Sequence, residues 1–202
     1  MMILHSSPAS PFVRKARIAA SVLGLADKID VRDTDLNDPA DPLRAQNPLG
    51  KIPALIMEDG TAYYDSRVIL EVLDHVAGGG KILPAESKAR FAALRLQALC
   101  DGILDAGVLM IYESRYRPPE KLVQTWVDRQ ADKVARALSV LEASPPAIDA
   151  PPNVGQIALA CALGYQDLRF GGTWRKIYPN LVAWLDHFAA QVPAFAETKV
   201  EP

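Results

Sequence analysis

The stretch SSPASPFVRK, residues 6–15, decides how the first part of the chain folds. It follows a short apolar run, residues 2–4, and opens a helical pattern that continues to Leu23. A residue before proline is kept out of the right-handed helical region, so we expect Ser10 at the N-cap and Pro11 at the first helical position. Backbone N–H groups and the helix dipole favour an anion there. The Ser10 hydroxyl therefore suits chemistry at an anion site. The same sequence is also typical of a serine that only caps the helix.

The residues around this stretch predict a small mixed α/β unit. Gly24 follows the helix as a C-cap, and residues 28–32 alternate polar and apolar like a half-buried strand. Strand, helix and strand in so short a space predict a βαβ unit with parallel strands. Residues 36–50 are irregular because of two Asp-Pro pairs and Asn47-Pro48, with one short helix expected over residues 43–46.

Two further strands and a helix complete this unit. The apolar runs 52–57 and 61–64 flank an Asp-Gly turn, which predicts an antiparallel hairpin. Apolar residues at helical spacing then predict a helix over about 66–77. This order of elements is the one that a thioredoxin-like domain requires.

The second part of the chain is helical in pattern. The run Gly78-Gly79-Gly80 to Pro84 is the clearest break in composition, so we divide the chain into a domain at 1–78, a linker at 79–85 and an all-α domain at 86–202. We expect Ser87 to cap a long helix over 88–116, Pro118-Pro119 to stop it, and a loop over 144–153. Pro118-Pro119 is also expected to start another helix that reaches Glu142. A further helix is expected over 157–168, preceded by Asn153 and Gln156, which resemble a capping box, and a last helix over 179–190.

The composition bounds the class of protein. The chain has 202 residues, half of them apolar, and a net charge of −2, which gives no electrostatic reason to expect a nucleic-acid or anionic-membrane partner. Its two cysteines form no CxxC motif and no cluster with histidine, so neither a disulfide scaffold nor a metal site is expected. No stretch approaches the length needed to span a bilayer. We therefore expect a soluble, cytoplasmic protein.

Two more motifs suggest a binding site, each with a plainer alternative. A cis bond before Pro53 would turn the N–H and C=O of Ile52 outward, where an extended peptide could pair with them, yet most X-Pro bonds are trans. At the start of the third helix, Ser66 and the helix N-terminus could hold an α-carboxylate and Asp65 an α-ammonium. Asp65 or Ser66 could also be only a helix cap.

Taken together, these motifs resemble the cytosolic glutathione transferase superfamily, and most of all its bacterial serine-type members. The resemblance is carried over nearly the whole chain by SPFVRK at 10–15, NPLGKIPAL at 47–55, YDSRVI at 64–69 and YPNL with Trp184-Leu185 near the end. It implies a thioredoxin-like domain followed by an all-α domain, with glutathione as co-substrate and no metal. It also implies a homodimer.

The resemblance implies a role for individual residues. Ser10 would stabilise the glutathione thiolate, with Ser7 as the alternative donor. Phe12 would border the thiol, a cis Pro53 would present Ile52 to the cysteinyl backbone, Lys51 would reach the glycine carboxylate, and Asp65 with Ser66 would hold the γ-glutamyl end. Asp65 stands where Glu or Gln is commoner in the family, and Asn153 and Gln156 stand where Ser or Thr and Asp are usual.

The second substrate would bind between the domains, against the long helix. Asp105, Tyr112 and Arg115 are the candidates for that pocket. Asp105 also sits where some family members reach glutathione across a dimer interface, and Asp101 is the alternative for that contact.

The resemblance implies conjugation of glutathione to a small hydrophobic electrophile, as in detoxification. Glutathione-dependent peroxide reduction or dehalogenation is an alternative. A third is a non-catalytic binding or regulatory protein, against which the retained set Ser10, Pro53, Asp65 and Ser66 argues.

Overall fold

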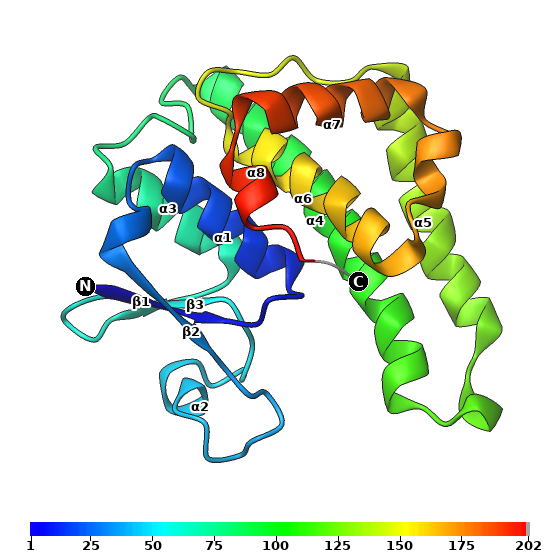
Figure 1. Ribbon diagram of the computed structural model, residues 1–202, viewed down its shortest axis with the longest axis horizontal. Coiled ribbons are helices and arrows are strands. Elements are labelled where there is room, and N and C mark those ends of the chain that lie inside the picture. The colour runs from blue at the N-terminus through cyan, green and yellow to red at the C-terminus, as the bar shows by residue number, and fades with distance from the viewer. Residues whose placement is uncertain (201–202) are drawn as a thin grey trace.

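The computed structural model describes residues 1–200, which form a four-stranded mixed sheet followed by a helical half (Figure 1). The strands are β1 (Met2–Ser6), β2 (Ile29–Asp33), β3 (Ala54–Ile56) and β4 (Ala62–Tyr63), in the order β2-β1-β3-β4. β1 and β2 are parallel, with Met2 opposite Ile29, while β3 is antiparallel to both β1 and β4. The predicted βαβ unit and hairpin are therefore confirmed, as is the thioredoxin-like class of this half.

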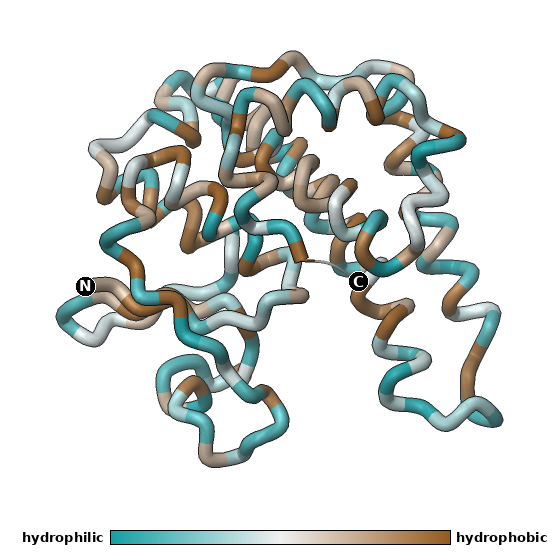
Figure 2. Tube along the Cα trace, in the orientation of Figure 1, coloured by the Kyte–Doolittle hydropathy of each residue, from teal (hydrophilic) through white to brown (hydrophobic). Residues whose placement is uncertain are grey.

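The two faces of the sheet are covered differently because strand side chains alternate between faces. Leu4 and Leu55 join the main core, where α1 (Pro11–Val22) and α3 (Ser66–Val76) pack against each other and against the sheet. On the other face, Ala54 and Ile56 form a small separate cluster with Leu43 of α2 (Leu43–Gln46). Figure 2 shows how polar the long loop around α2 is.

The helical half is built around α6 (Val154–Phe170). Its first thirteen residues are all buried, and it contacts α1, α4 (Ser87–Tyr116) and α7 (Pro179–Gln191). The predicted capping box is present, with Asn153 accepting from the backbone N–H of Gln156 and Gln156 accepting from that of Asn153. α5 (Gln124–Ala143) packs on α4. Within residues 1–200, every helix is too short or too polar to cross a lipid bilayer.

The structure corrects two of the helix boundaries. The long helix is capped by Glu86, whose carboxylate accepts from the N–H groups of Lys88 and Ala89, and Ser87 is its first residue instead of its cap. The α7 helix is not the last, because Pro193 starts a further short helix, α8 (Ala194–Glu197), that packs on α1. Short 3-10 turns also occur at Ala26–Lys28, Pro119–Lys121 and Thr173–Lys176.

Candidate active site

Ser10 is the N-cap of α1, as predicted. Its backbone is extended, and its hydroxyl oxygen accepts a 3.3 Å hydrogen bond from the N–H of Val13. That bond uses a lone pair of the hydroxyl and leaves the O–H proton available for donation. Ser7 lies one turn earlier, where its carbonyl accepts from the N–H of Ser10 at 3.0 Å. Ser10 lines a cavity that Ser7 does not reach, so the two candidates for thiolate donor differ in position.

The loop before β3 leaves the backbone N–H and C=O of Ile52 without partners inside the described chain. The Ile52–Pro53 peptide bond is cis, as the resemblance implies. Neither the N–H nor the C=O of Ile52 forms a hydrogen bond within residues 1–200. Asn47 fixes the loop: it is buried, its amide donates to the carbonyl of Lys51 at 2.8 Å, and it accepts from the N–H of Leu49. The sequence interpretation gave Asn47 no such role, although an Asn before a turn is a recognisable signal.

Asp65 and Ser66 begin α3 with different surroundings. Asp65 is the N-cap, accepting from the N–H of Arg67 at 2.9 Å, and its carboxylate is largely exposed. Ser66 is buried, and its hydroxyl accepts from the ammonium of Lys15 at 3.2 Å. The hydroxyl proton of Ser66 is therefore still free to be donated.

Behind these residues lies a buried charge network that the sequence interpretation did not foresee. Lys15 of α1 is fully buried and forms a 2.5 Å ion pair with Asp101 of α4. The second carboxylate oxygen of Asp101 is also buried, 3.4 Å from Nε of Arg67, and has no hydrogen-bond partner within residues 1–200. Asp101 thus lies inside the network, whereas it was predicted only as an alternative to Asp105. Partial burial and the neighbouring charge of Asp101 raise the pKa of Asp105.

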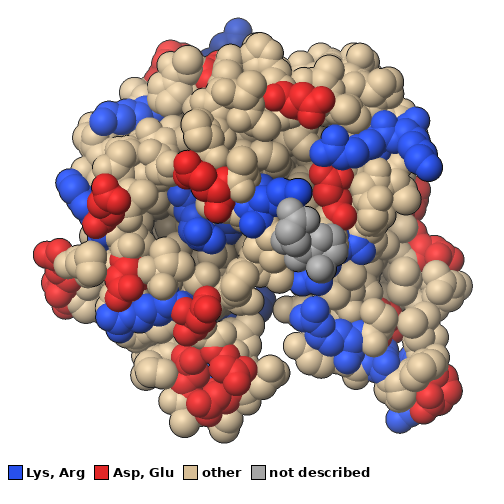
Figure 3. All heavy atoms as spheres, in the orientation of Figure 1, with Lys and Arg blue, Asp and Glu red and all other residues tan. Residues whose placement is uncertain are grey.

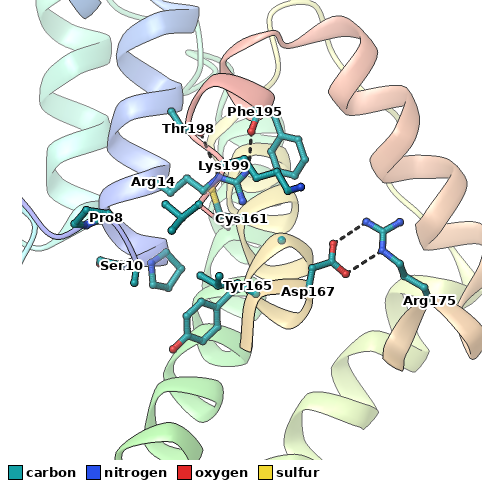
Figure 4. A pocket seen from close by; sticks show the side chains of 15 residues that line it. Pro8, Ser10, Arg14, Cys161, Tyr165, Asp167, Arg175, Phe195, Thr198 and Lys199 are labelled. Carbon is teal, nitrogen blue, oxygen red and sulfur yellow. Dashed lines mark hydrogen bonds and ion pairs between the residues drawn. The ribbon is translucent and has the colours of Figure 1, made fainter. Parts of the chain in front are cut away.

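A cavity of about 210 Å³ adjoins Ser10 (Figure 4). It is bounded by the start of α1, by α6, by the turn after α6 and by the C-terminal segment that includes α8. Tyr165 and Cys161 of α6 line it, and burial raises the pKa of the Cys161 thiol to about 12. On the far wall, Arg175 donates to both carboxylate oxygens of Asp167, at 2.9 and 2.7 Å.

The predicted second-substrate residues do not line this cavity. Asp105, Tyr112 and Arg115 lie along α4, where the rings of Tyr112 and Tyr116 make an edge-to-face contact and the Arg115 guanidinium lies 5.9 Å from the Tyr112 ring centre. The cavity beside Ser10 is instead walled by α6 and the C-terminal segment. Phe12 is also absent from its lining and is packed against the main core, with the Lys15 ammonium 6.0 Å from its ring.

On the face shown in Figure 3, the two lobes at the lower edge of the molecule differ in the charge that predominates. Acidic side chains gather over the lobe that carries α2, and basic side chains gather over the facing ends of α4 and α5. Within residues 1–200, no group of three His, Cys, Asp or Glu side chains is placed to hold a metal ion.

Comparison with known proteins agrees with this arrangement. Residues 4–81 match the family described as "Glutathione S-transferase, N-terminal domain", and residues 124–187 match "Glutathione S-transferase, C-terminal domain". An uncharacterized GST-like protein of Escherichia coli K12, YibF, is 33% identical over 205 residues, with 98% of each chain covered.

Solved structures are similar over the whole chain. A glutathione transferase family member from Pseudomonas fluorescens Pf-5 with bound glutathione is 40% identical, with 100% of both chains covered and a TM-score of 0.89. A glutathione S-transferase from Methylobacillus flagellatus KT, also with bound glutathione, is 34% identical, with 98% of this chain and 99% of that chain covered and a TM-score of 0.91. The fold, the two family matches and these relatives together show that the chain belongs to the glutathione S-transferase superfamily.

Proposed function

We propose that this protein is a glutathione transferase in which Ser10 holds the glutathione thiol as a thiolate for attack on a small hydrophobic electrophile. The observation that carries this proposal is the position of Ser10. Its hydroxyl lies at the N-terminus of α1 and on the wall of a cavity, with its proton uncommitted. Ser10 acts as a hydrogen-bond donor in this scheme and forms no covalent bond.

The energies are sufficient for this role. A free thiol has a pKa of about 8.5, and lowering it by two units requires about 2.7 kcal/mol. A charge-assisted hydrogen bond contributes about 1.5–3 kcal/mol, and the N-terminus of a helix contributes about 0.3–1 kcal/mol. One hydroxyl and one helix therefore account for the shift without a general base.

The rest of glutathione would follow the edge of the sheet. Its cysteinyl backbone pairs with the outward N–H and C=O of Ile52, and its γ-glutamyl end meets Asp65, Ser66 and the N-terminus of α3. Lys51 is exposed beside Ile52, and its ammonium would bind the glycine carboxylate. Phe12 borders the thiol. Structures of relatives with bound glutathione, and one from Pseudomonas fluorescens Pf-5 with S-(propanoic acid)-glutathione, support a site for glutathione and its thioethers in this fold.

We further propose a homodimer that acts in detoxification in the cytoplasm, with a glutathione-binding domain at 1–78, a linker at 79–85 and a helical domain at 86–202. The support is the family membership and the change from sheet to helices between α3 and α4. Asp105, Tyr112 and Arg115 on α4 are proposed as an outer part of the second-substrate site, beyond the cavity beside Ser10, whose lining they do not join.

The test is the ultraviolet absorbance of bound glutathione thiolate as a function of pH, for the native protein, Ser10→Ala and Ser7→Ala. We expect a thiol pKa about two units below the free value in the native protein and in Ser7→Ala, and a return toward about 8.5 in Ser10→Ala. A loss of the shift in Ser7→Ala alone would move the role to Ser7. Saturable binding with an unshifted pKa in all three proteins would contradict thiolate activation.

A further inference from the structure

Arg14 places a cationic group on the wall of the cavity that Ser10 lines. Its Nε donates to the hydroxyl of Thr198 at 3.2 Å, its Nη2 donates to the carbonyl of Phe195 at 2.5 Å, and its guanidinium lies 4.2 Å from the Phe195 ring centre (Figure 4). These contacts fix the guanidinium plane but supply no negative charge. Within residues 1–200, Arg14 forms no ion pair with a carboxylate.

The remaining nitrogen of Arg14 has space for a ligand beside it. Nη1 donates no hydrogen bond within residues 1–200 and lies directly over Gly164 of α6. A side chain at Gly164 would collide with Nη1, so the glycine makes the room in which the guanidinium reaches the cavity. An arginine offers five N–H donors, and two of these are used.

The carboxylate in the described part of the cavity lining is already paired with another arginine and not with Arg14. Asp167 is the one acidic residue among the described lining residues, and both of its oxygens accept from Arg175 while Oδ1 also accepts from the indole N–H of Trp174 at 2.8 Å. Among the described lining residues, Arg14 adds a cation that this carboxylate does not neutralise. A half-buried guanidinium without a carboxylate partner is costly to desolvate, and an anionic ligand would offset this cost.

Arg14 also lies near Ser10 on the same helix. The two residues are four apart at the start of one helix, and residues at this spacing lie on the same face with an axial rise of about 6 Å. Because both residues also line the same cavity, they suit a ligand with a reactive carbon at one end of a small ring or short chain and an anionic group at the other.

We propose that the cavity receives an electrophile bearing a carboxylate, which Arg14 holds while the reactive carbon meets the thiolate beside Ser10. This inference rests on the proposed transferase function and names the class of its second substrate. With an aryl chloride, the thiolate sulfur forms a bond to the chlorine-bearing carbon, and chloride leaves with the electron pair of the broken bond. The thiol proton has already been released to solvent.

The experiment compares 4-chloro-3-nitrobenzoate with 4-chloro-3-nitrobenzamide, which differ in the charge of one group. For each compound, kcat/KM is divided by the uncatalysed rate constant with glutathione, and the ratio of the two quotients measures selectivity for the carboxylate. A charge-assisted bond to Arg14 predicts a ratio of about 10 to 100 in favour of the benzoate.

Three variants assign this selectivity to Arg14. Arg14→Gln is expected to bring the ratio close to one, and Arg14→Lys to retain part of it, because the charge stays while the planar fork is lost. Arg17→Gln is the matched control: it removes one cation from the same helix at a position outside the cavity lining, so its ratio is expected to stay as in the native protein.

A native ratio close to one, with both compounds conjugated above the uncatalysed rate, would overturn the inference and leave the proposed function standing. A high native ratio that persists in Arg14→Gln would also overturn it, because another group would then hold the carboxylate. If neither compound is conjugated and no thiol pKa shift is seen, the proposed function fails and the inference fails with it. Should Arg14→Gln not fold, the native ratio and Arg14→Lys decide.

Discussion

Replacing Asp101 by asparagine tests how much the buried ion pair with Lys15 stabilises the fold. The pair joins α1 to α4 across 86 residues of sequence at 2.5 Å, and both side chains are almost fully buried. Asp101→Asn removes the counter-charge and leaves the Lys15 ammonium buried with only neutral acceptors, the Ser66 hydroxyl and the new amide oxygen. An uncompensated buried charge costs about 3–5 kcal/mol. With an unfolding entropy of about 0.4 kcal/mol/K for a chain of this length, the melting temperature should fall by about 7–12 °C.

The assay is a double-mutant cycle by urea and thermal denaturation. Lys15→Met is expected to cost less than Asp101→Asn, because Arg67 still lies 3.4 Å from the remaining carboxylate. The double variant buries no unpaired charge and should be more stable than the two single effects predict, by about 1–3 kcal/mol. Asp132→Asn is the control, since it breaks an exposed ion pair with Arg136 and should cost about 0.5 kcal/mol. Additivity within about 0.5 kcal/mol would refute the reasoning.

Three further predictions concern packing, capping and thiol chemistry. Gly155→Ala places a methyl group 2.7 Å from the carbonyl oxygen of Ala93 and should lower the free energy of unfolding in urea by about 1–3 kcal/mol. Gly102→Ala has open space around the new methyl group and should stabilise α4 by about 0.5–1 kcal/mol. Equal effects of the two substitutions would contradict this packing. Asn153→Ala removes the capping box and should cost about 0.5–2 kcal/mol by the same measurement, and an unchanged stability would show that the cap is not needed. Burial raises the pKa of the Cys161 thiol to about 12, so above about pH 8.5 the folded state binds more protons than the unfolded state. The free energy of unfolding that this thiol contributes therefore falls as the pH rises from there toward 12. Labelling by a thiol reagent at pH 8 should accordingly be slow in native protein and fast in urea, and rapid native labelling would contradict it.

The sequence alone predicts the helix starts and turns that have strong local signals. Pro11 after Ser10, the Asp-Gly turn at 59–60 and the Asn153–Gln156 box each place a helix start or a turn by backbone chemistry alone, and the structure has all of them. Ser87 failed as a cap because Glu86, one residue earlier, reaches two N–H groups with its longer side chain.

Other features depend on contacts between distant segments and leave no local signal. As a charged residue in an amphipathic helix, Lys15 is expected at the surface. Its burial is possible because Asp101, far along the chain, lies opposite it and pairs with its charge. Tertiary packing likewise brings α8 onto α1 and makes Phe195 and Thr198 part of the cavity wall. A four-residue helix after Pro193 is too short for a periodic pattern to predict.

The arrangement of the two chain ends has a practical consequence for preparing the protein. Met1 lies directly before the inner strand β1, where its ammonium contacts Glu58, and it is absent from the lining of the cavity beside Ser10. Lys199 and Val200, by contrast, form part of that lining. Residues fused after Val200 would follow closely on this wall, so kinetic work calls for a cleavable tag on the N-terminal side.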